Sequence, residues 1–230
     1  MCNLKSEDNT TMTHTTQPPI AQTMDFVHYE VKERVGYITL TRSEKRNALN
    51  AEMVTELKRA FAAAEEDESC KVIVLRAEGK VFCAGADLEY LQRLQQYDYH
   101  DNLADSTHLM ELFRQIYTLK KVVIAQVHGH AIAGGCGLAA ICDFTFTVPD
   151  AKFGYTEVKI GFIPAIVKVF LLRKIGEARA KQLLLTGDLI SADEAQVYGL
   201  VNYVVAAEEL EQKVFNFAQK LCNEISRHSM

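Results

Sequence analysis

The chain has 230 residues, of which 48% are hydrophobic and 24% are charged, and its formal net charge is −5. This length and composition suffice for one sizeable domain with a hydrophobic core. The acidic balance gives no basic field that would attract nucleic acid or an anionic membrane, and no apolar run reaches the roughly 18 residues that a membrane span needs. We therefore expect no nucleic-acid partner and no membrane partner.

Residues 1–23 are polar, rich in Thr and Gln, and contain two consecutive prolines, so we expect a disordered tail and no secretory signal there. A main domain is expected over residues 24–230. The six cysteines form no C-x-x-C pair and no metal-finger spacing, and several lie among apolar residues. This pattern is typical of reduced core thiols in a cytoplasmic protein, and we expect no metal site.

In the first part of the chain the pattern predicts a hairpin, a helix and a buried strand. Residues 26–31 alternate apolar and polar side chains, and residues 37–40 continue as a second strand. Asn50 can cap a helix whose apolar positions, within residues 53–64, follow the helical period. The apolar run at 72–75 predicts a strand that is buried on both faces.

Strands and helices continue to alternate after that strand. Asp87 begins a predicted helix over residues 88–94, and the polar, aromatic stretch 97–105 is expected to be mobile. The remaining predicted strands lie at 122–127, 143–148 and 202–205, and the remaining helices lie at 109–119, 134–142, 165–174, 177–185, 191–198 and 208–225. This alternation predicts an α/β fold with a largely parallel sheet.

Two segments end a predicted strand and begin a predicted helix with small residues at the turn. One is FCAGAD at 82–87, and the other is GGCGL at 134–138. Small residues let a ligand approach backbone N–H groups closely, and a helix N-terminus leaves several of these groups without an internal partner. If the two turns meet, they offer two N–H donors to one oxygen atom, which would stabilise charge that develops on a carbonyl.

Several motifs occur in a fixed order from about Asp25 to the C-terminus. They are RNALN at 46–50, FCAGADL at 82–88, VHG at 127–129 with GG at 134–135, CD at 142–143, FGYTE at 153–157 with Gly161 and Pro164, and LTG at 185–187 with EA at 194–195 and GLV at 199–201. In order and spacing they resemble the crotonase superfamily, the enoyl-CoA hydratase/isomerase enzymes. Within this superfamily, the sequence most resembles bacterial methylglutaconyl-CoA and enoyl-CoA hydratases.

The resemblance implies a crotonase-like spiral of ββα turns that binds an acyl-CoA thioester. No separate cofactor is implied, because the CoA thioester is the substrate. The backbone N–H groups of Ala86 and Gly134 would be the two oxyanion donors. Substrate and CoA contacts would come from Ala48, Leu49, Ala84, Gly85, Asp87, Leu88, Gly135 and Gly137. The acyl pocket would have its walls in residues 88–112 and 162–170.

The resemblance also concerns assembly and the end of the chain. Such members usually form homotrimers or dimers of trimers. They generally continue with further helices that close the CoA site and pack between subunits. Because this sequence stops at Met230, soon after its last predicted helix, we expect the C-terminal helices to be truncated.

The carboxylates distinguish between reactions. The resemblance implies that a hydratase of this family typically uses two glutamates, one to activate water and one to protonate the α-carbon. Aligned by motif, Glu157 is the second glutamate, but the first falls on Gly137, which has no side chain. Glu157 lies among aromatic and apolar residues, so partial desolvation would raise its pKa towards a range useful for a base.

Three functions stay open at this point. A hydratase of the methylglutaconyl-CoA or enoyl-CoA type is preferred because stretch 161–166 resembles that branch, and it would need a water relay or a second group. Candidates for that group are Asp101, Asp105, His108 and Glu111. An enoyl-CoA isomerase would need only Glu157, and a non-catalytic acyl-CoA-binding protein would need no base. As an alternative to a missing catalytic group, the small Gly137 would make room for a bulky or polar acyl tail.

Overall fold

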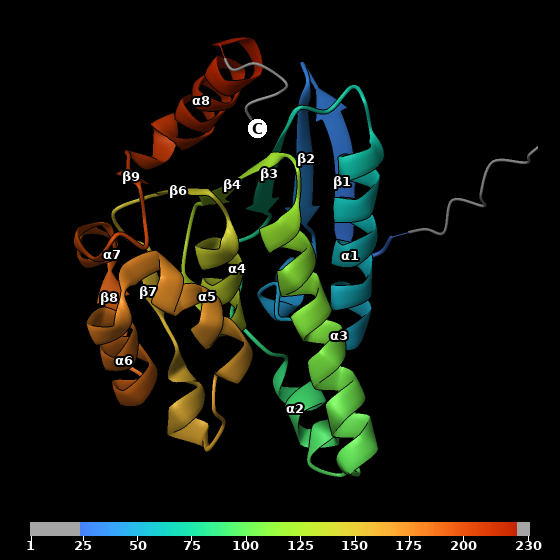
Figure 1. Ribbon diagram of the computed structural model, residues 1–230. Coiled ribbons are helices and arrows are strands. Elements are labelled where there is room, and N and C mark those ends of the chain that lie inside the picture. Colours follow the sequence, from blue (N-terminus) through green and yellow to red (C-terminus); the bar gives the residue numbers. More distant parts are fainter. Residues whose placement is uncertain (1–23, 225–230) are drawn as a thin grey trace, which may run out of the picture.

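The computed structural model describes residues 24–224, so the predicted tail at 1–23 lies outside the described residues (Figure 1). Within that range strands alternate with helices, and the predicted α/β architecture is confirmed. No helix among these residues is long and apolar enough to cross a membrane.

The larger sheet follows the predicted strands closely. Its strands, in order across the sheet, are β1 (Val27–Lys32), β2 (Val35–Leu40), β3 (Val72–Ala77), β4 (Val122–Val127), β6 (Phe144–Thr147) and β9 (Tyr203–Val204). The first pair is antiparallel, which confirms the predicted hairpin, and all later pairs are parallel. The first four residues of β3 are fully buried, as expected for a central strand covered on both faces.

A smaller sheet was not predicted from the sequence. It consists of β5 (Ala131–Ile132), β7 (Lys152–Gly154) and β8 (Ile190–Ser191). Strands of two or three residues are too short to show an alternating pattern, so periodicity gives no signal for them. This sheet matters for the site, because β5 leads directly into the second small-residue turn.

The helices surround these sheets (Figure 1). They are α1 (Ala51–Glu66), α2 (Leu88–Leu94), α3 (Tyr99–Thr118), α4 (Gly134–Ile141), α5 (Ala165–Ile175), α6 (Glu177–Thr186), α7 (Ala192–Tyr198) and α8 (Leu210–Glu224), with 3-10 turns η1 (Ser43–Lys45), η2 (Thr156–Ile160) and η3 (Ala207–Glu209). The Asn50 side chain accepts a hydrogen bond of 2.9 Å from the N–H of Met53, which confirms the predicted cap of α1. Helices α1 and α3 pack side by side.

The stretch expected to be mobile is instead the first part of α3. The Asp98 side chain caps this helix by accepting a hydrogen bond of 2.9 Å from the N–H of Asp101. The side chain of Asn102 donates to the carbonyls of Tyr97 and Asp98. These local bonds and the cap extend a helix that the hydrophobic pattern predicts only from residue 109, because its first turns bury few apolar side chains.

Candidate active site

The two small-residue turns meet in the structure. Cys83 pairs with Ala131 at the start of β5, and the N–H of Ile132 donates to the Cys83 carbonyl at 3.0 Å. Gly85 has φ +92°, and a Cβ atom on it would lie 2.6 Å from the Cβ of Ala133 and 3.5 Å from the nitrogen of Gly134. Only glycine permits both this backbone conformation and this close approach.

Two backbone N–H groups at this junction have no backbone acceptor. Leu49 pairs with Ala86 through the carbonyl of Gly85 and the N–H of Asp87, at 2.7 and 2.9 Å, which leaves the N–H of Ala86 unused. Gly134 is the first residue of α4, so its N–H has no acceptor within the helix. Within residues 24–224 neither N–H donates a hydrogen bond, and both residues line the same cleft.

Ala133 holds a strained conformation just before Gly134. Its φ of 52° and ψ of −125° lie in a region that residues with a side chain rarely adopt. The N–H of Ala133 donates to the carbonyl of Gly154 in β7 at 2.7 Å. Strain of this kind costs on the order of 1–3 kcal/mol and persists only where the surrounding structure holds it. The pairing with β7 therefore fixes the direction in which the next N–H points.

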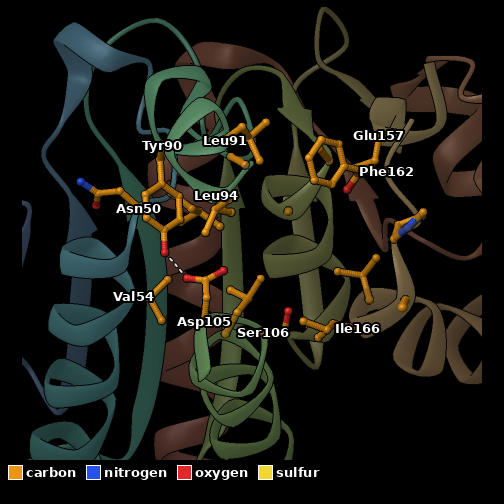
Figure 2. Close-up of a pocket in the computed structure, with 18 of the residues that line it drawn as sticks. Asn50, Val54, Tyr90, Leu91, Leu94, Asp105, Ser106, Glu157, Phe162 and Ile166 are labelled. Carbon is orange, nitrogen blue, oxygen red and sulfur yellow. Dashed lines mark hydrogen bonds between the residues drawn. The ribbon is translucent and has the colours of Figure 1, made fainter. Parts of the chain in front are cut away.

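The cleft has a volume of about 340 Å³ and is mainly apolar. Its walls come from the start of α1, from α2 and α3, and from the segment that joins η2 to α5 (Figure 2). The lining includes Leu49, Asn50, Val54, Tyr90, Leu91, Leu94, Asp105, Ser106, His108, Leu109, Phe162, Ile163, Ile166 and Val167. Residues from both predicted walls, within 88–112 and 162–170, line this cleft.

Glu157 lies on the same cleft as the two N–H groups. It is the second residue of η2, and Figure 2 shows it beside Phe162. Its Oε2 atom is buried and has no hydrogen-bond partner within the described part of the chain. Burial raises the pKa of this carboxyl above its ordinary value. The structure thus brings together one partly desolvated carboxyl and two free N–H donors.

Gly137 is buried in α4 and does not line the cleft. A Cβ atom on it would lie 2.5 Å from Cγ1 of Val167 and 3.0 Å from the ring of Phe113. The expectation that Gly137 makes room for an acyl tail was therefore wrong, because these two side chains already occupy that space. Val167 covers it from the cleft side.

The four candidates for a second acid or base separate into two groups. Asp105 and His108 line the cleft, whereas Asp101 and Glu111 do not. The hydroxyl of Tyr90 donates to Asp105. Tyr90 was not identified from the sequence, because its position in an apolar helical pattern indicates core packing and hides the role of its hydroxyl.

His108 and Glu111 take part in bonds between α3 and α1. Nε2 of His108 lies 3.0 Å from the hydroxyl of Thr55, and its Nδ1 lies 3.3 Å from Nζ of Lys58. Lys58 also forms an ion pair of 2.7 Å with Glu111. These contacts hold the two helices together, and they leave Asp105 as the candidate carboxyl that faces the cleft.

Of the residues expected to contact substrate or CoA, Leu49 lines this cleft with the two N–H donors. Those that do not line it are Ala48, Ala84, Gly85, Asp87, Leu88, Gly135 and Gly137. The carboxylate of Asp87 pairs with Arg42 at 2.7 Å and caps α2, so its side chain has a structural role. Leu88 is 71% exposed and remains available to a ligand outside the cleft.

The described residues contain no group of three or more side chains suited to hold a metal ion. Asp143, from the CD motif, accepts a hydrogen bond of 2.8 Å from the N–H of Val123 and so links two strands of the larger sheet. The five cysteines within 24–224 are free and buried, as expected for core thiols.

Comparisons with known proteins identify the family to which this chain is similar. A family model described as enoyl-CoA hydratase/isomerase matches residues 30–230. A putative enoyl-CoA hydratase of Thermus thermophilus is 41% identical over 198 residues, which are 86% of this chain and 77% of that protein. A crotonyl-CoA hydratase of Syntrophomonas wolfei is 38% identical over 194 residues, 84% of this chain and 74% of that protein.

Solved structures agree with the sequence matches. A putative enoyl-CoA hydratase/isomerase (crotonase) of Legionella pneumophila has a TM-score of 0.85 and 36% identity, and the match covers 87% of this chain and 78% of that chain. An enoyl-CoA hydratase of Mycobacterium smegmatis has a TM-score of 0.81 and 35% identity, with 85% and 76% covered. The predicted crotonase-like fold is therefore confirmed.

Proposed function

The chain belongs to the enoyl-CoA hydratase/isomerase family of enzymes, and from that premise we propose that it adds water to a 2-enoyl-CoA thioester. One observation carries the proposal: Ala86, Gly134 and Glu157 line a single cleft. The first two supply unused N–H groups, and the third supplies a carboxyl whose buried Oε2 atom has no hydrogen-bond partner within 24–224. The names of the relatives from Thermus thermophilus and Syntrophomonas wolfei favour hydration over other reactions of the family.

In this proposal the N–H groups of Ala86 and Gly134 form an oxyanion hole. When a water oxygen bonds to the β-carbon, the π electrons move towards the thioester and leave negative charge on its oxygen. Two preorganised donors stabilise that enolate, each by roughly 3–4 kcal/mol in comparable sites. The positive end of α4, which begins at Gly134, adds to this stabilisation.

Glu157 moves the proton in the proposed reaction. Its carboxylate accepts a proton from the attacking water, and the resulting acid returns a proton to the α-carbon as the enolate collapses. Atoms and charge balance, because one water molecule adds across the double bond and Glu157 ends in its starting state. A raised pKa suits the first step, since a stronger base takes the proton from water more readily.

Isomerisation is the second candidate, and one observation favours it. The position that holds a hydratase's first glutamate by resemblance is Gly137, and Val167 and Phe113 fill the space beside it. A single carboxyl suffices for an isomerase, in which Glu157 would remove a proton from one carbon and return it two bonds away.

The test is a turnover screen with crotonyl-CoA, 3-methylglutaconyl-CoA and a trans-3-enoyl-CoA, run in ¹⁸O-labelled water and, in parallel, in D₂O. Hydration predicts a 3-hydroxyacyl product that carries the label, detected by mass. Deuterium exchange with double-bond migration, and no label, would replace the proposal with the isomerase. Acyl-CoA binding without any turnover would refute both reactions and leave the non-catalytic alternative.

We also propose that the protein assembles as a homotrimer or a dimer of trimers, as the family resemblance implies. Light scattering of the purified protein tests it, because a mass of three or six chains of 25.8 kDa is expected and a single chain would contradict it.

A further inference from the structure

A carboxylate lies on the cleft wall formed by α3, away from the proposed reacting groups. We propose that this residue, Asp105, makes the cleft select enoyl-CoA substrates with uncharged acyl tails and reject tails that end in a carboxylate. The inference rests on the proposed function, because it assigns a substrate class to the same cleft. It also opposes a methylglutaconyl-type substrate, whose acyl group carries a second carboxylate.

Asp105 is held in place by a buried tyrosine. Tyr90, in α2, is 9% exposed, and its hydroxyl donates to Oδ1 of Asp105. Within the residues that the structure describes, no other hydrogen bond reaches the Asp105 carboxylate. Figure 2 shows Asp105 below Tyr90, with its second oxygen directed away from the tyrosine ring. One carboxylate oxygen is therefore satisfied, and the other is available to a ligand.

The described lining of the cleft, within residues 24–224, offers no lysine or arginine to a charged tail. Lys58 lies near His108, but it forms an ion pair of 2.7 Å with Glu111 and does not line the cleft. Nε2 of His108 lies near the hydroxyl of Thr55 and the carbonyl of Ala51, at 3.0 and 3.3 Å.

Arg93 lines a neighbouring recess and not the cleft. The guanidinium of Arg93 lies 5.5 Å from the centre of the Tyr90 ring. It lines a recess that also contains Glu52, Asp101 and Asp105, so acidic residues outnumber the cation there. Arg93 is absent from the lining of the cleft itself.

A tail carboxylate in this cleft would meet two costs. It would lose water against apolar walls such as Val54, Leu94 and Leu109, and it would face the like charge of Asp105. Two like charges about 5 Å apart at an intermediate dielectric repel strongly enough to lower affinity by at least about tenfold. An uncharged tail meets neither cost and gains from contact with the same walls.

The experiment compares glutaconyl-CoA with its methyl ester, which lacks the charge of the tail and is larger by one methyl group. In the unaltered protein we expect kcat/KM for the ester to exceed that for the acid at least tenfold. In Asp105→Asn the ratio of acid to ester should rise at least tenfold, because the like charge is gone while the side chain keeps its shape. Asp101→Asn is the matched control on the same helix, outside the cleft, and should leave the ratio within about twofold of its starting value.

Equal ratios in the two variants, or a preference of the unaltered protein for the acid, would overturn the inference. If Asp105→Asn fails to fold, the preference of the unaltered protein still decides. Binding of butyryl-CoA and succinyl-CoA by calorimetry separates this inference from the proposed function, because both acyl groups have four carbons and need no turnover. Weaker binding of succinyl-CoA supports charge rejection even if no enoyl-CoA is hydrated, and equal binding refutes it.

Discussion

Replacing Gly137 by alanine tests whether the space at the usual first-glutamate position is filled. A glycine in the interior of a helix costs about 1 kcal/mol relative to alanine, so Gly137→Ala would by itself stabilise α4 by that amount. The added Cβ, however, would lie 2.5 Å from Val167 Cγ1 and 3.0 Å from the Phe113 ring. Overpacking of this kind costs about 1–3 kcal/mol, so we expect a net loss of about 1 kcal/mol in the free energy of unfolding.

A double-mutant cycle identifies the cause of that loss. Val167→Ala removes Cγ1, the atom in closest contact, so the combined variant should be at least about 1 kcal/mol more stable than the sum of the single changes predicts. Val169→Ala is the matched control, because Val169 lies on the same helix with 48% exposure. Its combination with Gly137→Ala should be additive within about 0.5 kcal/mol.

The assay is urea unfolding monitored by circular dichroism. The slope of the unfolding free energy against urea concentration should be the same in all variants. A stabilisation of about 1 kcal/mol in Gly137→Ala would refute the packing argument, since it would show the propensity gain without any clash. Additive behaviour of Gly137→Ala with Val167→Ala would refute it as well. Either result would reopen the idea that this position has room for an acyl tail.

Four further predictions concern the site and its support. Glu157→Gln should lower kcat by about 10³-fold while acyl-CoA binding measured by calorimetry stays within threefold, and unchanged turnover would remove Glu157 from the mechanism. Since burial raises the pKa of Glu157 and the base acts deprotonated, kcat/KM of the unaltered enzyme should fall as pH decreases through a value above 4.5, which a pH profile tests. Gly134→Pro should lower kcat by about 10²–10³-fold relative to Gly134→Ala, which keeps the N–H, and equal rates would exclude this donor. Asp87→Asn should lower the free energy of unfolding by about 3 kcal/mol at neutral pH, because Arg42 loses its buried partner. Burial acts to raise the pKa of Asp87, but Arg42 and the capping N–H groups have the larger combined effect, so the pKa lies below its ordinary value of 3.8. In urea unfolding, the difference in stability between the unaltered protein and Asp87→Asn should therefore shrink as the pH falls below 3.8.

Sequence signals were reliable for features that depend only on neighbouring residues in the chain. Asn50 and Asp87 cap the helices predicted to follow them, because capping depends on a side chain and the next few N–H groups. The two glycine-rich turns were likewise visible, since close approach restricts the residue type. Their meeting point could be inferred only by resemblance to a family, because no local pattern records which turns become neighbours.

Contacts between side chains of different helices could not be predicted from the sequence. The bond from Tyr90 to Asp105 joins two helices that a short connection separates, and nothing in either helical pattern indicates it. Gly137 was expected to leave room for an acyl tail, because the sequence does not show that Val167, from a later helix, packs against it. Sequence patterns predict which faces are apolar, but they do not predict which side chain fills a given gap.

The short pairing of β5 with β7 positions both the Gly134 N–H donor and Glu157. Gly154, at the end of β7, holds Ala133 through a hydrogen bond of 2.7 Å, and the chain then reaches η2 and Glu157. The donor at Gly134 and the proton carrier are therefore aligned from one pair of backbone segments. A change in this small sheet would misalign donor and base together without touching either, so activity should be more sensitive there than stability.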